Sequence, residues 1–245
     1  MKPKVGAIVE ARMTSSRLPG KHLLPVLGQP IIGHLIRRLQ SIPSVDEVIV
    51  AMTVRPEDDV LETYVSNIGA KVFRGDGEDV MGRVLNAARK SHVDIICEVT
   101  GDCPIIDVNL VAQVIDTYIS NDASYVNNGK LGLPDGMGCQ VFSTKTLKKS
   151  ASMTREPLDR EHVTLHIKRN PALFPAIYIP PLKSHFWPEL AVTLDEADDY
   201  RLIKSIIESI GEQNPYFNCV DVINLLHEHP DWIEINRHVK RKGET

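Results

Sequence analysis

Apolar and polar positions follow two different periods along the first half of the chain. Apolar runs rich in β-branched residues predict strands at residues 5–9, 47–51, 71–73, 94–99 and 123–126. Between these runs, apolar residues recur at helical spacing and predict helices at residues 30–42, 56–68, 78–91 and 107–120. Asp107 is the expected N-cap of the last of these helices.

Strands that are almost continuously apolar and that alternate with helices are typical of a parallel sheet covered on both faces. The pattern therefore predicts an α/β fold with a mostly parallel, doubly wound sheet. In such sheets a ligand binds at the carboxyl ends of the strands, where the strand order reverses. Residues 12–21 and 101–104 each follow a predicted strand, so we expect both segments to face one crevice.

The second half of the chain has a looser pattern. Residues 127–138 are rich in turn formers, 139–143 and 191–194 predict short strands, and 159–169, 197–210 and 219–229 predict helices. We interpret residues 1–245 as a single domain in which 128–188 form a small mixed insertion over the crevice, suited to acceptor choice or subunit contact. The basic residues near the end, Arg237, Lys240, Arg241 and Lys242, are interpreted as a solvated tail.

Composition narrows the class of protein. The chain has 42% hydrophobic residues, 24% charged residues and a formal net charge of -4, which is ordinary for a soluble protein and argues against a nucleic-acid-binding surface. No apolar run approaches the roughly 20 residues that span a bilayer. Four cysteines without CxxC spacing predict reduced thiols and a cytoplasmic location.

A basic loop follows the first predicted strand. Arg12, Ser15, Arg17 and Lys21 lie within ten residues, and guanidinium, hydroxyl and ammonium groups together suit a polyphosphate. The loop is neither a Walker A motif, because His22 follows Gly20-Lys21, nor a GxGxxG fingerprint. The alternative is a solvated loop with ordinary surface arginines.

Two isolated aspartates follow later strands. Asp102 comes after the strand at 94–99, beside Thr100 and Gly101, and Asp195 follows the strand at 191–194. Mg²⁺ is commonly held by one or two carboxylates together with substrate phosphates, so this pair predicts a magnesium site. The alternative for Asp102 is a turn or N-cap aspartate. The acids after Asp195, at 196, 198 and 199, are assigned to the first turn of a helix.

Other polar residues are less specific. Arg74 and Arg83 follow the third strand and could bind a nucleobase or phosphate, or form surface salt bridges. His162 and His166 stand four residues apart beside Glu161, but without a third ligand a structural role is favoured over zinc.

Taken together, these motifs resemble a known family. Residues 11–21, with Arg12, Ser15, Arg17 and Lys21, resemble the N-terminal signature of the CMP-sugar synthetases, the acylneuraminate and 3-deoxy-manno-octulosonate cytidylyltransferases. The segments 73–75, 100–107, 135–136, 160–164 and 194–195 look closer to the branch of the spore coat polysaccharide biosynthesis protein F. Cys103 stands where the octulosonate enzymes have an acidic residue.

The resemblance implies a GT-A-like nucleotidyltransferase fold that uses CTP and Mg²⁺, releases pyrophosphate and forms a homodimer. Arg12, Ser15 and Lys21 match the triphosphate loop, and Asp102 and Asp195 match the metal-binding aspartates. Lys21, Arg12 and Asp102 are the expected catalytic residues. Arg12, Ser15, Arg17, Lys21, Arg74, Thr100 and Gly101 are the expected nucleotide-binding residues.

The resulting hypothesis is a Mg²⁺-dependent cytidylyltransferase that transfers CMP from CTP to a 2-keto sugar acid for the synthesis of a surface polysaccharide. Two alternatives remain open from the sequence: a GT-A-type glycosyltransferase that uses a sugar nucleotide, and a non-catalytic nucleotide-binding module. The acceptor sugar and the preference for cytosine are not determined by the sequence.

Overall fold

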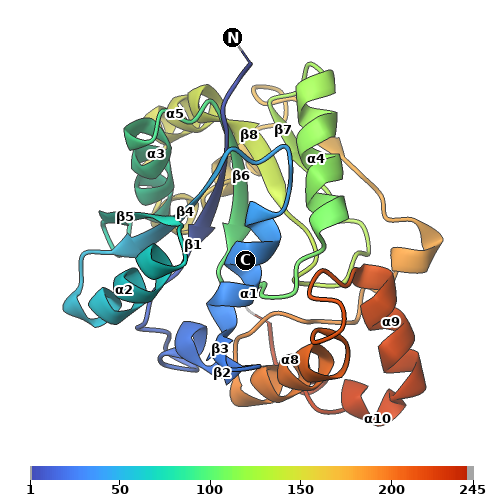
Figure 1. The fold of residues 1–245 in the computed structure, drawn as a ribbon. Coiled ribbons are helices and arrows are strands. Elements are labelled where there is room, and N and C mark those ends of the chain that lie inside the picture. The colour runs from blue at the N-terminus through green and yellow to red at the C-terminus, as the bar shows by residue number, and fades with distance from the viewer. Residues whose placement is uncertain (1, 242–245) are drawn as a thin grey trace.

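A seven-stranded sheet forms the centre of the computed structural model, which describes residues 2–241 (Figure 1). Its order is β5-β4-β1-β6-β8-β7-β9, and a two-stranded hairpin, β2-β3, lies apart from it. The strands are β1 (Val5–Glu10), β2 (Pro25–Val26), β3 (Gln29–Pro30), β4 (Glu47–Thr53), β5 (Lys71–Gly75), β6 (Ile95–Thr100), β7 (Tyr125–Asn127), β8 (Gln140–Ser143) and β9 (Ala176–Tyr178).

The sheet is mostly parallel, as the sequence predicts. β5, β4, β1 and β6 run parallel, with Ile8 opposite both Ile49 and Glu98. The chain moves from β1 to β4 and β5 on one side and then returns to β6 on the other, so the strand order reverses between β1 and β6. This is the position at which α/β sheets bind ligands.

Only β8 is antiparallel among the described strands of this sheet, and it lies between β6 and β7. Residues 128–188 therefore supply a strand to the middle of the sheet and a second strand, β9, to its edge. The strand predicted at 191–194 is wrong: Ala191 forms only an isolated bridge with Asp135. The segment is held by contacts to two loops, and none of the described strands pairs with it along its length.

The helices and 3-10 turns match most of the predicted spans. The α-helices are α1 (Ile31–Gln40), α2 (Asp59–Asn67), α3 (Val80–Lys90), α4 (Val108–Ser120), α5 (Thr144–Met153), α6 (Pro157–Glu161), α7 (Leu165–Arg169), α8 (Ala197–Ile210), α9 (Cys219–Glu228) and α10 (Pro230–Ile233), with 3-10 turns at Lys21–Leu23, Pro56–Asp58 and Lys183–His185.

One predicted helix, 159–169, is divided into α6 and α7. His162 leaves the helical conformation with φ -103° and ψ 88°. The buried Thr164 donates from its hydroxyl to Gln140 Oε1 at 2.6 Å, which fixes the break against β8.

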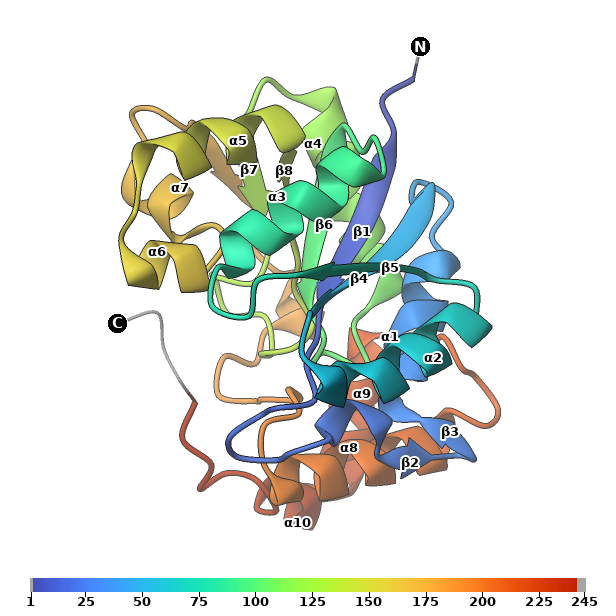
Figure 2. The same ribbon diagram turned by 90° about the vertical axis from the view of Figure 1, so that its left-hand side faces the viewer.

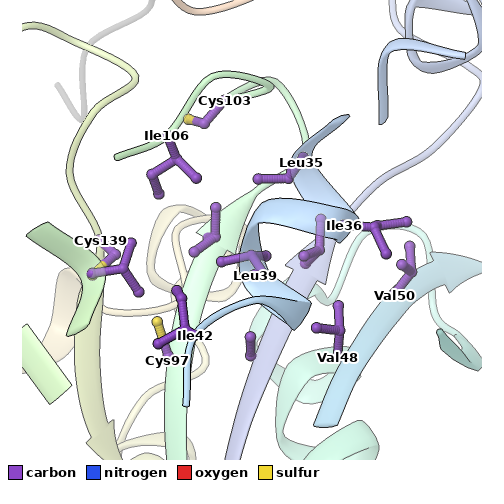
Figure 3. Packing of buried hydrophobic residues seen from close by; sticks show 14 of the residues in the cluster. Leu35, Ile36, Leu39, Ile42, Val48, Val50, Cys97, Cys103, Ile106 and Cys139 are labelled. Atoms are coloured by element: carbon purple, nitrogen blue, oxygen red, sulfur yellow. The ribbon is translucent and has the colours of Figure 1, made fainter. Parts of the chain in front are cut away.

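The helices cover both faces of the sheet. α1, α2 and α4 pack on one face, where Leu35, Ile36 and Leu39 of α1 lie over Val48 and Val50 (Figure 3). α3 and α5 cover the other face (Figure 2). α8, α9 and α10 form a further layer with β2 and β3 (Figure 2). No described helix combines the length and the apolar character needed to span a bilayer.

Two buried polar residues connect this C-terminal layer to the loop after β6. Asp107 caps α4 by accepting from the backbone N–H of Asn109 at 2.8 Å, and it also accepts from the N–H of Cys219 at 2.8 Å. Arg38 donates to Ile106 O of that loop at 3.3 Å and to Phe217 O at 2.8 Å, and it stacks over the Phe217 ring. Because buried polar groups must find partners, these contacts hold the β6 loop in one position.

Candidate active site

Three loops far apart in the sequence are joined by backbone hydrogen bonds near the end of β6. Leu194 N–H donates to Asp102 O at 2.8 Å, and Val192 N–H donates to Asp135 O at 2.8 Å. Asp135 N–H in turn donates to Leu190 O at 2.9 Å. These bonds place the residue before Asp195 directly against Asp102, although the two aspartates are 93 positions apart in the chain.

Two glycines allow this close packing. A Cβ on Gly101 would lie 2.7 Å from Glu10 O and 2.9 Å from a ring carbon of His22. Gly136 has a φ of +96°, and a Cβ there would lie 3.0 Å from the backbone of Val192. Both positions therefore require the absence of a side chain.

Lys21 joins the two predicted metal aspartates. Its ammonium group donates to Leu194 O at 2.6 Å and lies 3.2 Å from Asp195 Oδ1 and 3.5 Å from Asp102 Oδ2. Gly20, with φ 73°, turns the chain so that Lys21 enters the interior, where only 7% of the residue is exposed. Asp102 and Asp195 therefore face the same point.

The charges at this point perturb the neighbouring carboxyl groups. Burial raises the pKa of Asp102, but the Lys21 ammonium and a hydrogen bond from Thr100 outweigh burial and bring that pKa below its usual value. Burial and the negative charge of Asp102 raise the pKa of Asp135, which borders the same space. The raised pKa of Asp135 shows that its carboxyl group lies in a negative potential, which favours a cation beside it.

Two arginines also reach Asp195. Arg17 Nη2 lies 2.9 Å from Asp195 Oδ2, and Arg241 Nη1 lies 3.9 Å from the same oxygen. Arg241 also forms a two-pronged ion pair with the buried Asp199. The interpretation of the C-terminal basic residues as a solvated tail is therefore wrong for Arg241, because a buried carboxylate holds it; Lys242 lies outside the described residues.

Two of the acids after Asp195, Glu196 and Asp199, have the capping role expected of them, while Asp198 pairs with Arg201 in the first turn of α8. Glu196 is the N-cap of α8 and forms a capping box with Asp199. Asp199 Oδ2 accepts from the N–H groups of Asp195 and Glu196 at 3.0 and 2.8 Å. Asp199 thus fixes the backbone of Asp195 as well as Arg241.

Two cavities meet at these carboxylates. A smaller cavity of about 270 Å³ lies on the side of the basic loop, and a larger cavity of about 590 Å³ lies on the side of β8 and β9. Thr100, Asp102 and Asp195 line both cavities. The site can therefore hold two ligands that meet at Asp102 and Asp195.

The smaller cavity contains most of the predicted nucleotide-binding residues. Its lining includes Arg12, Ser15, Arg17, Lys21, Thr100, Gly101 and Asp102. Arg83 and His162 line this cavity as well. The Arg83 guanidinium donates a hydrogen bond to Asp76 O at 2.5 Å. The basic loop is therefore not a solvated surface loop.

Arg74 is the predicted nucleotide-binding residue that the structure places elsewhere. It lines neither of the two cavities. Its guanidinium pairs with Asp59 and Glu62 of α2 and donates to Arg55 O at 2.7 Å. Neighbouring acids on α2 thus occupy the donors that a phosphate would need.

This placement gives a testable result for Arg74. Arg74→Ala is expected to leave the KM for nucleotide within about twofold of the wild-type value, while unfolding becomes easier by about 1–2 kcal/mol because the α2 contacts are lost. Steady-state kinetics and denaturant unfolding measure the two effects. A tenfold rise in the nucleotide KM with unchanged stability would contradict the structural role.

His22 makes stability depend on pH. Burial, followed by the positive charge of Lys21, lowers the pKa of His22 from 6.5 to about 4. The unfolded chain takes up this proton as the pH falls below 6.5, but the folded chain does so only near pH 4, so folding stability is lost in that window. Between pH 7 and pH 5 His22 is expected to cost about 2 kcal/mol.

The measurement compares wild-type protein with His22→Gln by denaturant unfolding at pH 7 and pH 5. The variant is expected to lose about 2 kcal/mol less than wild type over that interval. Equal losses in the two proteins would show that His22 binds its proton at the same pH in the folded and unfolded states.

The carboxylate pair suits one class of metal ion. Within residues 2–241, no three His, Cys, Asp or Glu side chains are grouped closely enough to hold a metal by themselves. Mg²⁺ usually takes one or two carboxylates and completes its coordination with water and phosphate oxygens. Asp102 and Asp195 therefore fit an ion that arrives with a nucleotide.

The residues that line the larger cavity were mostly not found from the sequence. They include Lys130, Asp135, Lys168, Arg169, Tyr178 and Arg241. The Asp135-Gly136 turn is the one of these with a local signal, since an aspartate before a glycine marks a tight turn. The others come from short elements whose position depends on the whole sheet.

A basic loop, two convergent carboxylates and paired cavities at the switch point of a mostly parallel sheet are typical of a nucleotide-using transferase. The model of the family described as cytidylyltransferase matches residues 6–218. The chain belongs to the cytidylyltransferase family, and it is a CTP-dependent nucleotidyltransferase.

Relatives and solved structures agree with this assignment. The chain is 30% identical over 230 residues to the spore coat polysaccharide biosynthesis protein SpsF of Bacillus subtilis, covering 91% of this chain and 94% of that protein. It is 28% identical over 244 residues to a 3-deoxy-manno-octulosonate cytidylyltransferase of Geobacter metallireducens, covering 86% and 94%. A cytidylyltransferase structure from Leptospira borgpetersenii superposes with a TM-score of 0.89 at 30% identity, covering 98% of this chain and all of that one.

Proposed function

We propose that this protein transfers CMP from CTP to a 2-keto sugar acid, with Mg²⁺ as cofactor and pyrophosphate as the second product. The observation that carries the proposal is the position of Asp102 and Asp195, which line both cavities at the point where these meet. One cavity has the cations of the basic loop, and the other is large enough for a sugar. The glycosyltransferase and the non-catalytic module find no comparable support.

The transfer needs no protein nucleophile. The acceptor hydroxyl gives its proton to solvent and forms a bond to the α-phosphorus of CTP, while the bond from that phosphorus to the bridging oxygen breaks and pyrophosphate leaves with the electron pair. Catalysis of such a step depends on positioning and on stabilising charge. The smaller cavity would hold the triphosphate and the larger cavity the acceptor, so that the two substrates meet in line.

The residues of the chain divide this work. Arg12, Arg17 and Lys21 would bind the β- and γ-phosphates and stabilise the charge of the departing pyrophosphate. Ser15 would donate a hydrogen bond to a phosphate oxygen. In this structure Lys21 and Arg17 both pair with Asp195. When a nucleotide binds, these two cations would pair with its phosphates and release Asp195 for Mg²⁺.

Asp102 and Asp195 would hold Mg²⁺. When bound there, the ion would reduce repulsion between the phosphates and the acceptor oxygen and would lower the pKa of the acceptor hydroxyl. The lowered pKa of Asp102 keeps that carboxylate ionised and able to act as a ligand.

The proposal is tested by measuring pyrophosphate release from the purified protein. Each of the four nucleoside triphosphates is combined with a panel of 2-keto sugar acids, with Mg²⁺ and with EDTA. The expected result is release that requires CTP, a sugar acid and Mg²⁺ together. Release of a nucleoside diphosphate from a sugar nucleotide, in place of pyrophosphate from CTP, would favour a glycosyltransferase.

The homodimer implied by the family resemblance and a role in polysaccharide synthesis belong to the same proposal. Size-exclusion chromatography with light scattering measures the first. The cytoplasmic location stays a prediction from the reduced cysteines, all four of which are free and buried.

A further inference from the structure

Arg241 is held in place by a buried carboxylate beside the candidate metal site. Its Nη2 and Nη1 donate to Asp199 Oδ1 and Oδ2 at 2.6 and 2.9 Å, and Asp199 is fully buried. Burial lowers the pKa of Arg241, but the hydrogen bonds to Asp199 outweigh it and raise that pKa above its usual value. The guanidinium is therefore a permanent cation in a fixed orientation.

The backbone around Arg241 is fastened to the same site. Asn236 donates from its side chain to Asp199 Oδ1 at 2.8 Å and to Ala191 O at 3.0 Å. Arg17 of the basic loop donates to Lys240 O at 3.1 Å. The segment 236–241 thus contacts the loop of Asp195 and the basic loop, and its last described residue points into the site.

Arg241 lines the larger cavity and also comes within 3.9 Å of Asp195 Oδ2. Arg169 and Lys130 also line this cavity, but Arg169 pairs with Asp159 and Lys130 lies over the Tyr178 ring, whereas Arg241 reaches Asp195. The match to the family model ends at residue 218, so Arg241 lies beyond the part of the chain that this match describes.

The chemistry of a 2-keto sugar acid identifies what Arg241 would bind. Its carboxylate is attached to the same carbon that carries the reacting hydroxyl. A cation that binds the carboxylate must therefore lie next to the catalytic aspartates, and Arg241 meets this condition. Arginine has five N–H donors, and Asp199 engages two of its nitrogens, which leaves donors for a second carboxylate.

We infer that Arg241 binds the carboxylate of the acceptor and thereby selects sugar acids over neutral sugars. This inference rests on the proposed function, because it concerns the acceptor of that reaction. Asp199 acts as a positioning residue: it holds the guanidinium before the acceptor arrives, so that little side-chain entropy is lost on binding.

The test compares Arg241→Gln, Arg241→Lys and wild type with two acceptors, a 2-keto sugar acid and the same sugar with its carboxyl group converted to a primary amide. Arg241→Gln is expected to raise the KM for the acid about 10- to 100-fold, with the KM for CTP within about twofold of wild type. The KM for the amide is expected to change little, so Arg241→Gln would bind the acid and the amide with similar KM values. Arg241→Lys is expected to retain part of that preference.

Arg237→Gln serves as the matched control. Arg237 comes from the same segment, but it is exposed and pairs with Glu234, and it does not line the larger cavity. The control is expected to behave as wild type with both acceptors. Calorimetric binding of the acid to protein saturated with a non-reactive CTP analogue gives a second readout, in which Arg241→Gln is expected to weaken binding by the same factor.

Three results would overturn the inference. Arg241→Gln could retain the wild-type preference for the acid, or it could raise the KM for CTP in place of that for the acceptor. It could also raise the KM for both acceptors by the same factor, which would indicate a structural role. If Arg241→Gln melts well below wild type, the test uses Arg241→Lys in its place, because lysine keeps a positive charge against Asp199. The ratio of the KM for the amide to the KM for the acid is then compared between Arg241→Lys and wild type. If wild type itself releases no pyrophosphate with any sugar acid, the proposed function fails, and the inference fails with it.

Discussion

Asp102→Asn is expected to lower kcat/KM for cytidylyl transfer by about a thousandfold or more, which corresponds to about 4 kcal/mol of transition-state stabilisation. Asn has nearly the same shape as Asp but carries no charge, so it cannot stabilise a divalent ion against the phosphates. Asp102 lies 3.5 Å from the Lys21 ammonium and lines both cavities, so in the proposed reaction its charge would act directly on the reacting groups.

The measurement is pyrophosphate release at saturating Mg²⁺, with thermal melting to verify the fold. Asp116→Asn, an exposed residue of α4, is the matched control and is expected to keep wild-type turnover. A loss of less than tenfold in Asp102→Asn, with an unchanged melting temperature, would remove Asp102 from the catalytic centre.

Lys21→Met has the second largest expected effect, a loss of kcat/KM of about a hundred- to a thousandfold. Methionine keeps the apolar length of the side chain but removes the cation that lies between Asp102 and Asp195. Pyrophosphate then departs with less of its charge stabilised, so kcat falls, and the triphosphate binds more weakly, so the KM for CTP rises.

Stability gives an independent readout for the same variant. Without Lys21, Asp102 and Asp195 repel each other, and the melting temperature in EDTA is expected to fall. Added Mg²⁺ is expected to raise the melting temperature of Lys21→Met more than that of wild type, because the ion no longer competes with an ammonium group. Lys145→Met on α5 is the control, and an equal response to Mg²⁺ in all three proteins would refute the shared site.

Much of the molecule around the smaller cavity could be predicted from local pattern. Apolar runs fixed the positions of β1, β4, β5 and β6, and the alternation with helices fixed their parallel direction. Since parallel strands end at one edge, the residues after β1 and β6 had to lie together, and Lys21 does lie beside Asp102.

The acceptor side could not be predicted in the same way. β8 is too short to show its direction, and its position between β6 and β7 depends on pairing with strands on either side. Arg74 was assigned to the nucleotide because acids of α2 that neutralise it become neighbours only in the folded chain. Arg241 looked solvated because a run of basic residues carries no sign that one member faces a buried carboxylate.

The place of β8 also has a consequence for the order in which the molecule assembles. Among the described strands, β8 alone connects β6 to β7, so the sheet consists of a four-stranded part and a three-stranded part joined along one strand. The four-stranded part needs no residue beyond 100, although its β1–β6 pairing joins residues about 90 positions apart, whereas the three-stranded part joins the sheet through the pairing of β8 with β6. Tyr178 and Gln140, which border the larger cavity, belong to the three-stranded part. Amide exchange is therefore expected to reveal two cooperative units, with the amides of the four-stranded part protected for longer than those of the three-stranded part.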